Sequence, residues 1–538
     1  MTEWRCLVRG HSFKSIPRRK LRRVRFNLSH ERRMTCDPFY LYPVLVDDCL
    51  PGDHWKIANE IVIRVSPMVT PIMHEINAFV HYYFVPYRLL WDQWEEFITG
   101  GRDGKFVADI PKYVKTPNTG ASTESGSLWD YLGFNVVAWA DKGNLRDTPV
   151  VFPHRAYNLI WNEYYRDQNL VEEVPLSYVN RATRDLHIRC WEKDYFTSML
   201  PWQQRGDAPA FPIQGVLNMS FPSPEVNATD GIVPTFYNMQ GQLSNRGFSV
   251  VGMDSSTTPS IFNTNVNAGT IFQNYLNKGT VNLQEAITFG VTELRYGFQV
   301  QKLLERLART GSRYTEYLRG VFGEYPTDDR LNRPEYIGGS KSPVIVSEVL
   351  QTSSSDSVSP QGNMSGHGLT ADRTYVSSYR VKEHGLIMGI MSIMPRSMYQ
   401  QGIDRVWLKT DRFSYYVPEF AHLSEQAVYP SEIYNYVGSP NEKLGYQGRW
   451  DEYRWKRSTV HGLFRDELDI WHMGRKFSTP PELNQDLVRP SVSEITSLKR
   501  VLAYPLEPMF LVSFGNKLHV TRPLPYMSVP GMIDHSGY

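Results

Sequence analysis

The segment Pro67–Gly101 constrains the fold more than any other part of the chain. Within it, Phe79–Val85 is an almost unbroken run of aromatic and β-branched residues between two prolines, which predicts a β-strand buried on both faces. Across Arg88–Ile98 the apolar residues recur at helical spacing, and the glycines that follow predict the end of a helix. This strand and helix contain no catalytic group, so the segment favours a scaffold over an enzyme.

The composition indicates a mainly β protein. The 538 residues include 35 prolines, which interrupt helices and separate strands. Tyrosine (32 residues) outnumbers phenylalanine (25 residues), and tyrosine suits buried contacts in which one edge of the ring stays polar. Many strand-like segments and few helical ones fit antiparallel β-sandwiches with long loops better than a βαβ alternation.

Apolar periodicity places the other elements along the chain. A turn is predicted at 50–53, a short helix at 156–166, one long helical region at 283–319, a long β-rich segment at 374–395, and strands at 41–46, 60–65, 405–408 and 413–417. Residues 353–371 are expected to form a Ser/Gly-rich loop, and the chain after about 440 to be irregular.

Residues 223–280 differ in kind from the rest of the chain. Only five of these 58 residues are charged, while Asn, Thr, Ser and Gly are abundant. Weakly charged, turn-rich insertions are often exposed functional loops. We therefore expect an inserted surface loop at 223–280, followed by a helical insertion at 281–320.

The net charge of +2 hides a basic N-terminal arm. Residues 1–33 hold eleven Lys/Arg and two acids, whereas the remainder carries a net charge of −7. The arm predicts contacts with nucleic-acid phosphates through Arg18, Arg19, Lys20, Arg22, Arg23 and Arg25. Two alternatives stay open: the arm pairs with acidic neighbours at contacts between subunits, or it is a targeting signal.

Four scattered cysteines and a charged N-terminus indicate a soluble protein made inside the cell. Cys6, Cys36, Cys49 and Cys190 form no Cys-x-x-Cys pair, so we expect reduced, mostly buried thiols. No signal peptide is visible. The longest apolar run, Gly385–Met394, is shorter than the roughly 20 residues needed to span a bilayer.

Short motifs occurring in a fixed order carry a resemblance to a known family. The chain resembles the major capsid proteins of the Microviridae, the small single-stranded DNA bacteriophages, and most of all their gokushovirus branch. The matching segments run along almost the whole chain and include Phe26–Ser29, Leu50–Asp53, Phe84–Trp94, Asp194–Gly206, Gln301–Arg309, Gly311–Glu316, Arg333–Gly339, Pro360–Gly362, Glu383–Gly385, Tyr399–Gly402, Pro418–Ala421 and Leu444–Tyr446.

This resemblance implies an eight-stranded antiparallel jelly roll with long loop insertions and a few helices, formed by 1–538 as one domain. It further implies a T = 1 icosahedral shell of sixty copies around circular single-stranded DNA, with the arm 1–33 facing the interior. In the family, the insertion corresponding to 223–280 builds a protrusion at the threefold axes thought to meet a host cell-surface receptor. The host-attachment residues would then be Tyr237, Phe248, Phe262 and Tyr275.

The resemblance also implies partners and a location. The partners are a small basic DNA-packaging protein, a DNA pilot protein and a scaffolding protein during assembly. The chain would reside in the virion, after synthesis and assembly in the cytoplasm of a bacterial host. No cofactor, metal or membrane span is expected.

Large aromatic residues are expected to anchor the core or the contacts between copies, with the core favoured for each. They are Trp91, Trp94, Tyr195, Phe196, Trp202, Tyr446 and Tyr453. The chain contains no nucleophile elbow, phosphate-binding loop or zinc motif, so it is not expected to be an enzyme. The rival hypotheses are a carbohydrate-binding or carbohydrate-hydrolysing β-sandwich, motivated by the Trp and Tyr content, and a single-stranded DNA binding module.

Overall fold

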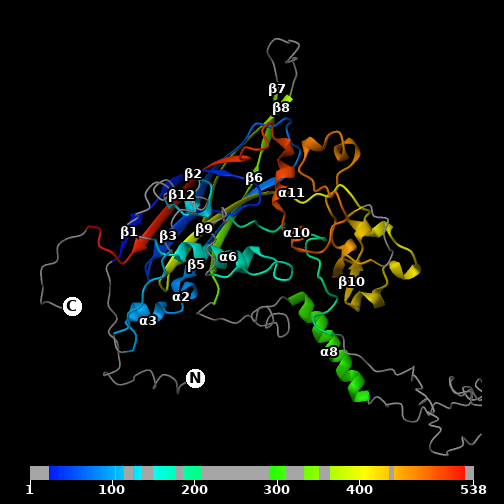
Figure 1. The fold of residues 1–538 in the computed structure, drawn as a ribbon, viewed down its shortest axis with the longest axis horizontal. Coiled ribbons are helices and arrows are strands. Elements are labelled where there is room, and N and C mark those ends of the chain that lie inside the picture. The colour runs from blue at the N-terminus through cyan, green and yellow to red at the C-terminus, as the bar shows by residue number, and fades with distance from the viewer. Residues whose placement is uncertain are drawn as a thin grey trace, which may run out of the picture. The chain divides into compact units, whose positions relative to one another are not determined.

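The structure is a computed structural model that describes residues 23–102, 105–113, 125–134, 149–176, 186–207, 291–310, 332–350, 364–434 and 442–527. One compact unit comprises 1–205 and 305–538, and a second comprises 206–304. Of the second unit, only 206–207 and 291–304 are described. The described chain is mainly β, with antiparallel sheets and few helices (Figure 1).

The first sheet has six strands in the order β1-β12-β4-β8-β7, with β2 also paired to β12. Because β1 and β2 pair with opposite ends of β12, they act together as one interrupted edge strand. All pairings are antiparallel. The strands are β1 (Val24–Asn27), β2 (His30–Cys36), β4 (His54–Val65), β7 (Val346–Leu350), β8 (Met364–Arg380) and β12 (Phe510–Arg522).

The second sheet has four antiparallel strands in the order β3-β9-β5-β6. They are β3 (Tyr42–Cys49), β5 (Ile76–Pro86), β6 (Glu335–Val344) and β9 (Gly385–Pro395). The main core lies between the two sheets. It joins Trp55 and Phe514 of the first sheet to Val80 and Ile393 of the second, and all four side chains are fully buried.

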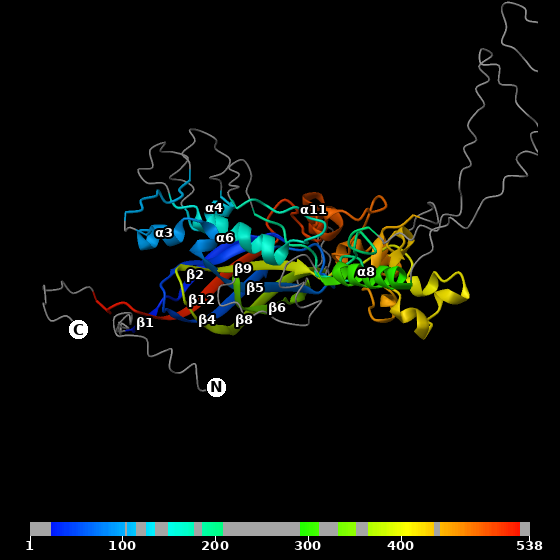
Figure 2. The same ribbon diagram turned by 90° about the horizontal axis from the view of Figure 1, so that it is seen from below.

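The outer face of the second sheet is covered as well. Tyr83 of β5 and Met388 of β9 pack against Tyr157 and Ile160 of helix α6 (Phe152–Ile160) in a separate apolar cluster. Figure 2 shows α3, α4 and α6 together on one side of the strands, with β4 and β8 toward the other side. The predicted two-sided burial of β5 is therefore confirmed: every residue of this strand is buried except His81, which is half-buried.

The remaining helices are short, apart from α8. They are α2 (Tyr87–Leu90), α3 (Trp94–Thr99), α4 (Leu128–Tyr131), a π-helical turn (Trp161–Tyr165) that extends α6, α8 (Val291–Thr310), α10 (Gln485–Val488) and α11 (Val492–Leu498). A two-stranded sheet joins β10 (Glu425–Val428) to β11 (Gly445–Gly448). Eight 3₁₀ turns lie around and beyond it: Arg405–Trp407, Arg412–Ser414, Pro418–His422, Pro430–Glu432, Asp451–Tyr453, Gly462–Arg465, Asp469–Trp471 and Lys499–Val501.

Two predicted strands are wrong. Residues 405–408 and 413–417 contain 3₁₀ turns. The carboxylate of Asp404 accepts a hydrogen bond from the amide of Val406, and that of Asp411 accepts one from the amide of Ser414. An aspartate that caps the following amides in this way favours a turn over an extended chain.

Other boundaries also differ from the prediction. The helix expected at 88–98 is two helices, because Trp91 adopts an extended backbone between α2 and α3. The loop expected at 353–371 is wrong from Met364 onward, where β8 begins. Strand β12 was missed altogether, in the region predicted to be irregular. Of the predicted helix 283–319, the described part forms α8, and the rest lies outside the described residues.

Candidate assembly surface

The segment that follows β9 forms a lobe, which we define as residues 396–434 and 442–509. Asp194, from the aromatic motif Asp194–Gly206, ties the lobe to the earlier chain. Its Oδ1 accepts hydrogen bonds from the amides of Phe196 (2.9 Å) and Thr197 (2.8 Å). Its Oδ2 accepts bonds from the hydroxyls of Ser397 and Tyr399, both at 2.7 Å. The motif is therefore a structural tie between distant segments.

A buried ion network holds the lobe together internally. Nη1 of Arg405 donates to Oε1 of Glu432 at 2.8 Å, and its Nε lies 4.0 Å from Oε1 of Glu452. Oε2 of Glu432 accepts a bond from the Tyr195 hydroxyl at 3.0 Å. Burial raises the pKa of Glu432 above its ordinary value, and the charge of Arg405 only partly opposes this rise. These carboxylates are packed inside the lobe and hydrogen-bonded there.

The outside of the same lobe carries unusually many exposed aromatic rings. Trp407 is 80% exposed and Trp455 65% exposed, although tryptophan is highly buried on average. The exposed aromatic surface comprises Trp407, Phe413, Tyr415, Tyr416, Tyr453 and Trp455. From their exposed fractions, the six side chains present on the order of 700 Å² to solvent. Apolar area exposed in this amount on one lobe favours an interaction site.

Contacts between the rings and nearby cations fix this surface. Nζ of Lys409 lies 4.4 Å from the centre of the Tyr415 ring and 4.8 Å from that of Tyr453. The ring of Tyr416 packs edge-on against Trp450 at 5.6 Å. Tyr and Trp rings held rigidly lose little conformational entropy when a partner covers them. The arrangement is suited to binding a macromolecule.

A cavity of about 530 Å³ lies beside these rings, lined by Lys409, Phe413 and Trp450 together with Arg405 and Glu452 of the ion network. Pockets next to aromatic anchors are typical of protein interfaces whose binding energy is concentrated in a few residues. Within the described residues, no group of three or more His, Cys, Asp or Glu side chains is placed to hold a metal ion. In the same part of the chain, no helix is both long and apolar enough to cross a membrane.

The structure distributes the predicted aromatic anchors among three environments. Tyr195 and Phe196 belong to the lobe's core, and Trp91 and Trp94 pack half-buried at the edge of the cluster under α6. Trp202 and Tyr446 are half-buried, and Tyr453 is exposed on the aromatic surface. Sequence reasoning missed Trp407, Tyr415, Tyr416 and Trp455, although the run Phe413-Ser-Tyr-Tyr was itself a signal of an aromatic surface.

The predicted nucleic-acid residues fall mostly outside the described chain. Arg18, Arg19, Lys20 and Arg22 lie there, while Arg23 and Arg25 are described and exposed. The predicted host-attachment residues Tyr237, Phe248, Phe262 and Tyr275 also lie outside the described residues.

Comparison with known proteins identifies the family. The family model described as capsid protein (F protein) matches residues 14–532. The chain belongs to this family. The capsid protein VP1 of Chlamydia phage 1 is 35% identical over 605 aligned positions, covering 98% of both chains. The capsid proteins VP1 of Bdellovibrio phage phiMH2K and Spiroplasma virus 4 are 32% and 26% identical, over at least 97% of each chain.

The resemblance to Microviridae capsid proteins is thereby confirmed, and with it a structural role as a capsid protein of the virion. In a capsid protein, exposed aromatic rings are suited to contacts between copies, because a shell is held together by such contacts. The lobe is for this reason our candidate assembly surface.

Proposed function

We propose that this chain is the major shell subunit of a microvirus and that its copies associate by covering the exposed aromatic surface of the lobe. The observation that carries the proposal is the concentration of exposed rings in this capsid-family chain, from Trp407 to Trp455. Obligate interfaces commonly bury about 2,000–5,000 Å², so the aromatic surface would be the centre of a wider contact.

The strand order supports an eight-stranded jelly roll. When β1 and β2 are taken together and the short β7 is set aside, eight strands remain: β2, β3, β4, β5, β6, β8, β9 and β12. They form the sheets β2-β12-β4-β8 and β3-β9-β5-β6. Numbered along the chain, these orders are 1-8-3-6 and 2-7-4-5, the arrangement expected of two interleaved Greek keys.

The shell itself is proposed to contain sixty copies with T = 1 symmetry around circular single-stranded DNA. Residues 1–538 would form one jelly-roll domain with insertions, with the arm 1–33 inside and the helical insertion 281–320 between loop and barrel. The proposed partners are a small basic packaging protein, a DNA pilot protein and a scaffolding protein. Assembly would take place in the bacterial cytoplasm.

Expression of the full chain together with the other proteins of its phage tests this function. Closed, uniform particles in electron micrographs are the expected result. A product that stays monomeric at high concentration would overturn the proposal, and sugar hydrolysis by such a monomer would favour the carbohydrate-active rival.

The loop 223–280 is proposed to attach the particle to its host, because of its low charge and its position in the family. Deleting it should leave particle yield unchanged and reduce adsorption to cells by at least tenfold. Normal adsorption by the deleted particles would refute the role in attachment.

A further inference from the structure

The described residues cover the two sheets unequally. The second sheet has the core on one face and α6 with its neighbours on the other, whereas the described part of the chain places the core on one face of the first sheet and no apolar cluster on the other. Alternation along β4 shows this directly: Trp55, Ile57 and Ile61 are buried, while Lys56 and Arg64 are exposed. An open sheet face with exposed side chains is a surface available to a partner.

This open face is strongly basic. We define the basic face as the side chains of β1, β2, β12, β4 and β8 that point away from the core. Seven cations and two carboxylates lie on it, which gives a net charge of +5. The cations are Arg25, Arg33, Lys56, Arg64, Arg373, Arg380 and Lys517, and the carboxylates are Glu31 and Glu60.

The cations are distributed along the whole length of the basic face, and we call this distribution the track. The strand pairings place the outward residues in six successive rows across the sheet, and every row contains at least one cation. The rows are Arg380-His54-Thr521-Arg25, Ser378-Lys56-His519-Asn27, Tyr375-Ala58-Lys517, Arg373-Glu60-Gly515-Glu31, Ala371-Val62-Ser513-Arg33 and Leu369-Arg64-Leu511-Thr35. Successive rows are about 6.7 Å apart, because each strand advances two residues per row. The cations of successive rows lie on different strands, so neighbouring cations are also displaced across the sheet.

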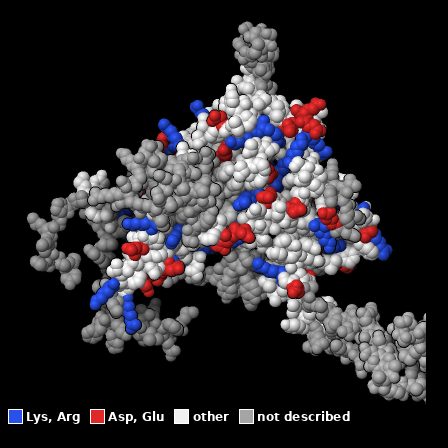
Figure 3. Space-filling view, in the orientation of Figure 1, with Lys and Arg blue, Asp and Glu red and all other residues white. Residues whose placement is uncertain are grey.

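Most cations of this track are not paired with a carboxylate. Lys517 forms an ion pair with Glu60 at 3.2 Å. Among the described residues, the other six cations form no ion pair. The opposite side of the molecule differs, since Figure 3 shows acidic and basic side chains interspersed on the face that Figure 1 presents. Six unpaired cations on one sheet face repel one another, so binding of an anionic partner would reduce this repulsion.

An exposed aromatic ring lies within the track. Tyr375 is 63% exposed and shares its row with Lys517. Cations that follow a backbone, together with an aromatic side chain on which bases stack, are the features of surfaces that bind single-stranded nucleic acid without sequence preference. An acidic polypeptide would use the cations but would gain nothing specific from the ring.

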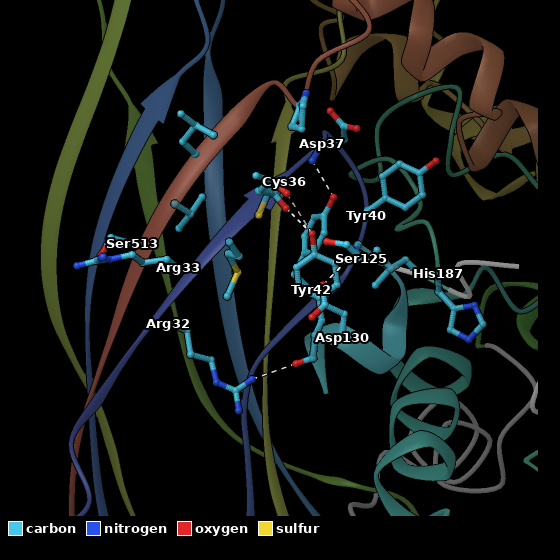
Figure 4. A pocket seen from close by; sticks show the side chains of 18 of the residues that line it. Arg32, Arg33, Cys36, Asp37, Tyr40, Tyr42, Ser125, Asp130, His187 and Ser513 are labelled. Atoms are coloured by element: carbon cyan, nitrogen blue, oxygen red, sulfur yellow. Dashed lines mark hydrogen bonds between the residues drawn. The ribbon is translucent and has the colours of Figure 1, made fainter. Parts of the chain in front are cut away.

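At one edge the basic face continues into a cavity of about 1620 Å³, shown in Figure 4. Arg33, Arg64 and Ser513 belong to both the face and the cavity. Deeper in the cavity, Nη1 of Arg32 donates to the backbone carbonyl of Tyr131 at 3.0 Å. A strand lying along the track would therefore meet further arginine and tyrosine side chains at this end.

We propose that the basic face of the first sheet binds the phosphate backbone of single-stranded DNA, with Tyr375 stacking on a base. The proposal rests on the function proposed above, since it identifies the surface of the subunit that faces the packaged DNA. The predicted arm 1–33 is in part folded into this site, because Arg25 belongs to β1 and Glu31 and Arg33 belong to β2. The remaining arm residues do not themselves neutralise this face, because residues 1–22 hold seven cations and one acid.

Binding of a fluorescently labelled 30-nucleotide poly(dT) to the unassembled full-length chain tests the proposal, with affinity measured by anisotropy between 0.05 and 0.4 M salt. Each phosphate contact on a single strand contributes about −0.7 to the slope of log affinity against log salt. The triple variant Lys56→Gln, Arg64→Gln, Arg373→Gln should lower the magnitude of this slope by about 2, and the affinity at 0.1 M salt about 100-fold.

A matched control removes three exposed cations elsewhere: Arg102→Gln, Lys105→Gln and Arg412→Gln. It carries the same change in net charge and should bind as the parent chain does. Equal losses in both triple variants would overturn the site, because net charge alone would then explain them.

A second variant tests the ring and does not depend on the charges. Tyr375→Ala should weaken binding about 5- to 150-fold with no change in the salt slope, and Tyr375→Phe should retain the affinity. Unchanged affinity in both the triple variant and Tyr375→Ala would overturn the proposal. Equally tight binding of polyglutamate, insensitive to Tyr375→Ala, would overturn it in favour of an acidic polypeptide. Because the assay uses unassembled chain, failure to form particles would count against the proposed function alone.

Discussion

Replacing Trp407 by alanine should impair assembly without impairing folding. The side chain is 80% exposed, so it offers on the order of 160 Å² to a neighbouring copy. At about 25 cal/mol per Å², covering that area contributes up to about 4 kcal/mol per contact. Part of the area stays covered by the alanine, so a loss of about 2–4 kcal/mol is expected, the range found for central aromatic residues of interfaces.

That loss converts to a higher concentration threshold for assembly. Each 1.4 kcal/mol corresponds to a factor of ten, so the threshold should rise about 30- to 1,000-fold. Sedimentation velocity over a concentration series, in the presence of the phage's other assembly proteins, measures the threshold. The melting temperature of the unassembled chain should stay within about 1 °C of the parent value, because an exposed side chain contributes little to the core.

Leu506→Ala is the control for this experiment. Leu506 is 96% exposed and lies outside the aromatic surface, so its replacement should leave the threshold unchanged. An unchanged threshold in Trp407→Ala, or an equal shift in both variants, would show that the exposed rings do not lie at contacts between copies.

Three further predictions concern the lobe that carries the surface. Arg405→Met should lower the free energy of unfolding by about 3–5 kcal/mol in urea titrations, because it leaves the buried carboxylates of Glu432 and Glu452 without their cation. Burial raises the folded-state pKa of Glu432, so its stabilising contribution is present at low pH and is lost as the pH rises through that pKa. Glu432→Gln should remove this pH dependence. If the free energy of unfolding changes between pH 4 and pH 8 by the same amount in Glu432→Gln as in the parent chain, the prediction is contradicted. Gly402→Ala should destabilise the lobe by more than about 2 kcal/mol in urea titrations, because its φ is +82° and a Cβ would lie 2.3 Å from the backbone oxygen of Glu432. Gly462→Ala is the control: its φ is +65° with open space around the added Cβ, so it should cost about 1 kcal/mol, and an equal loss in both variants would contradict the clash.

Local chemistry made part of the fold predictable. The β5 run is apolar on both faces because both faces are covered, so its sequence alone identifies it as a central strand. The turn at Leu50–Asp53 follows from its Pro-Gly pair, and the structure adds a hydrogen bond from the Leu50 amide to Oδ2 of Asp53. In both cases the determining interactions lie within a few residues of one another.

Strand β12 shows where such reasoning fails. Its inward residues alternate as Phe510, Val512 and Phe514, but Asn516 then occupies a core position and interrupts the apolar pattern. Asn516 is fully buried because its side-chain amide donates to the carbonyl of Val44 at 2.9 Å, almost 500 residues away in sequence. No local pattern reveals a partner that distant, and the same holds for the basic face, whose cations come from five separate strands.

The unequal covering of the two sheets suggests how the proposed subunit is oriented in the shell, with one side facing the interior and the other facing outward. A closed shell needs subunits whose two sides differ, because one side meets packaged polyanion and the other meets water. The second sheet is buried on both faces and has its helical cover outside, whereas in the described part of the chain the outward face of the first sheet is cationic and carries no such cover. If Lys56, Arg64 and Arg373 face the DNA, the helices around α6 face outward, and the lobe at the side meets neighbouring copies. Loss of DNA binding without loss of assembly in the basic-face variant, and the reverse in Trp407→Ala, would show that the two surfaces act independently, as this orientation requires.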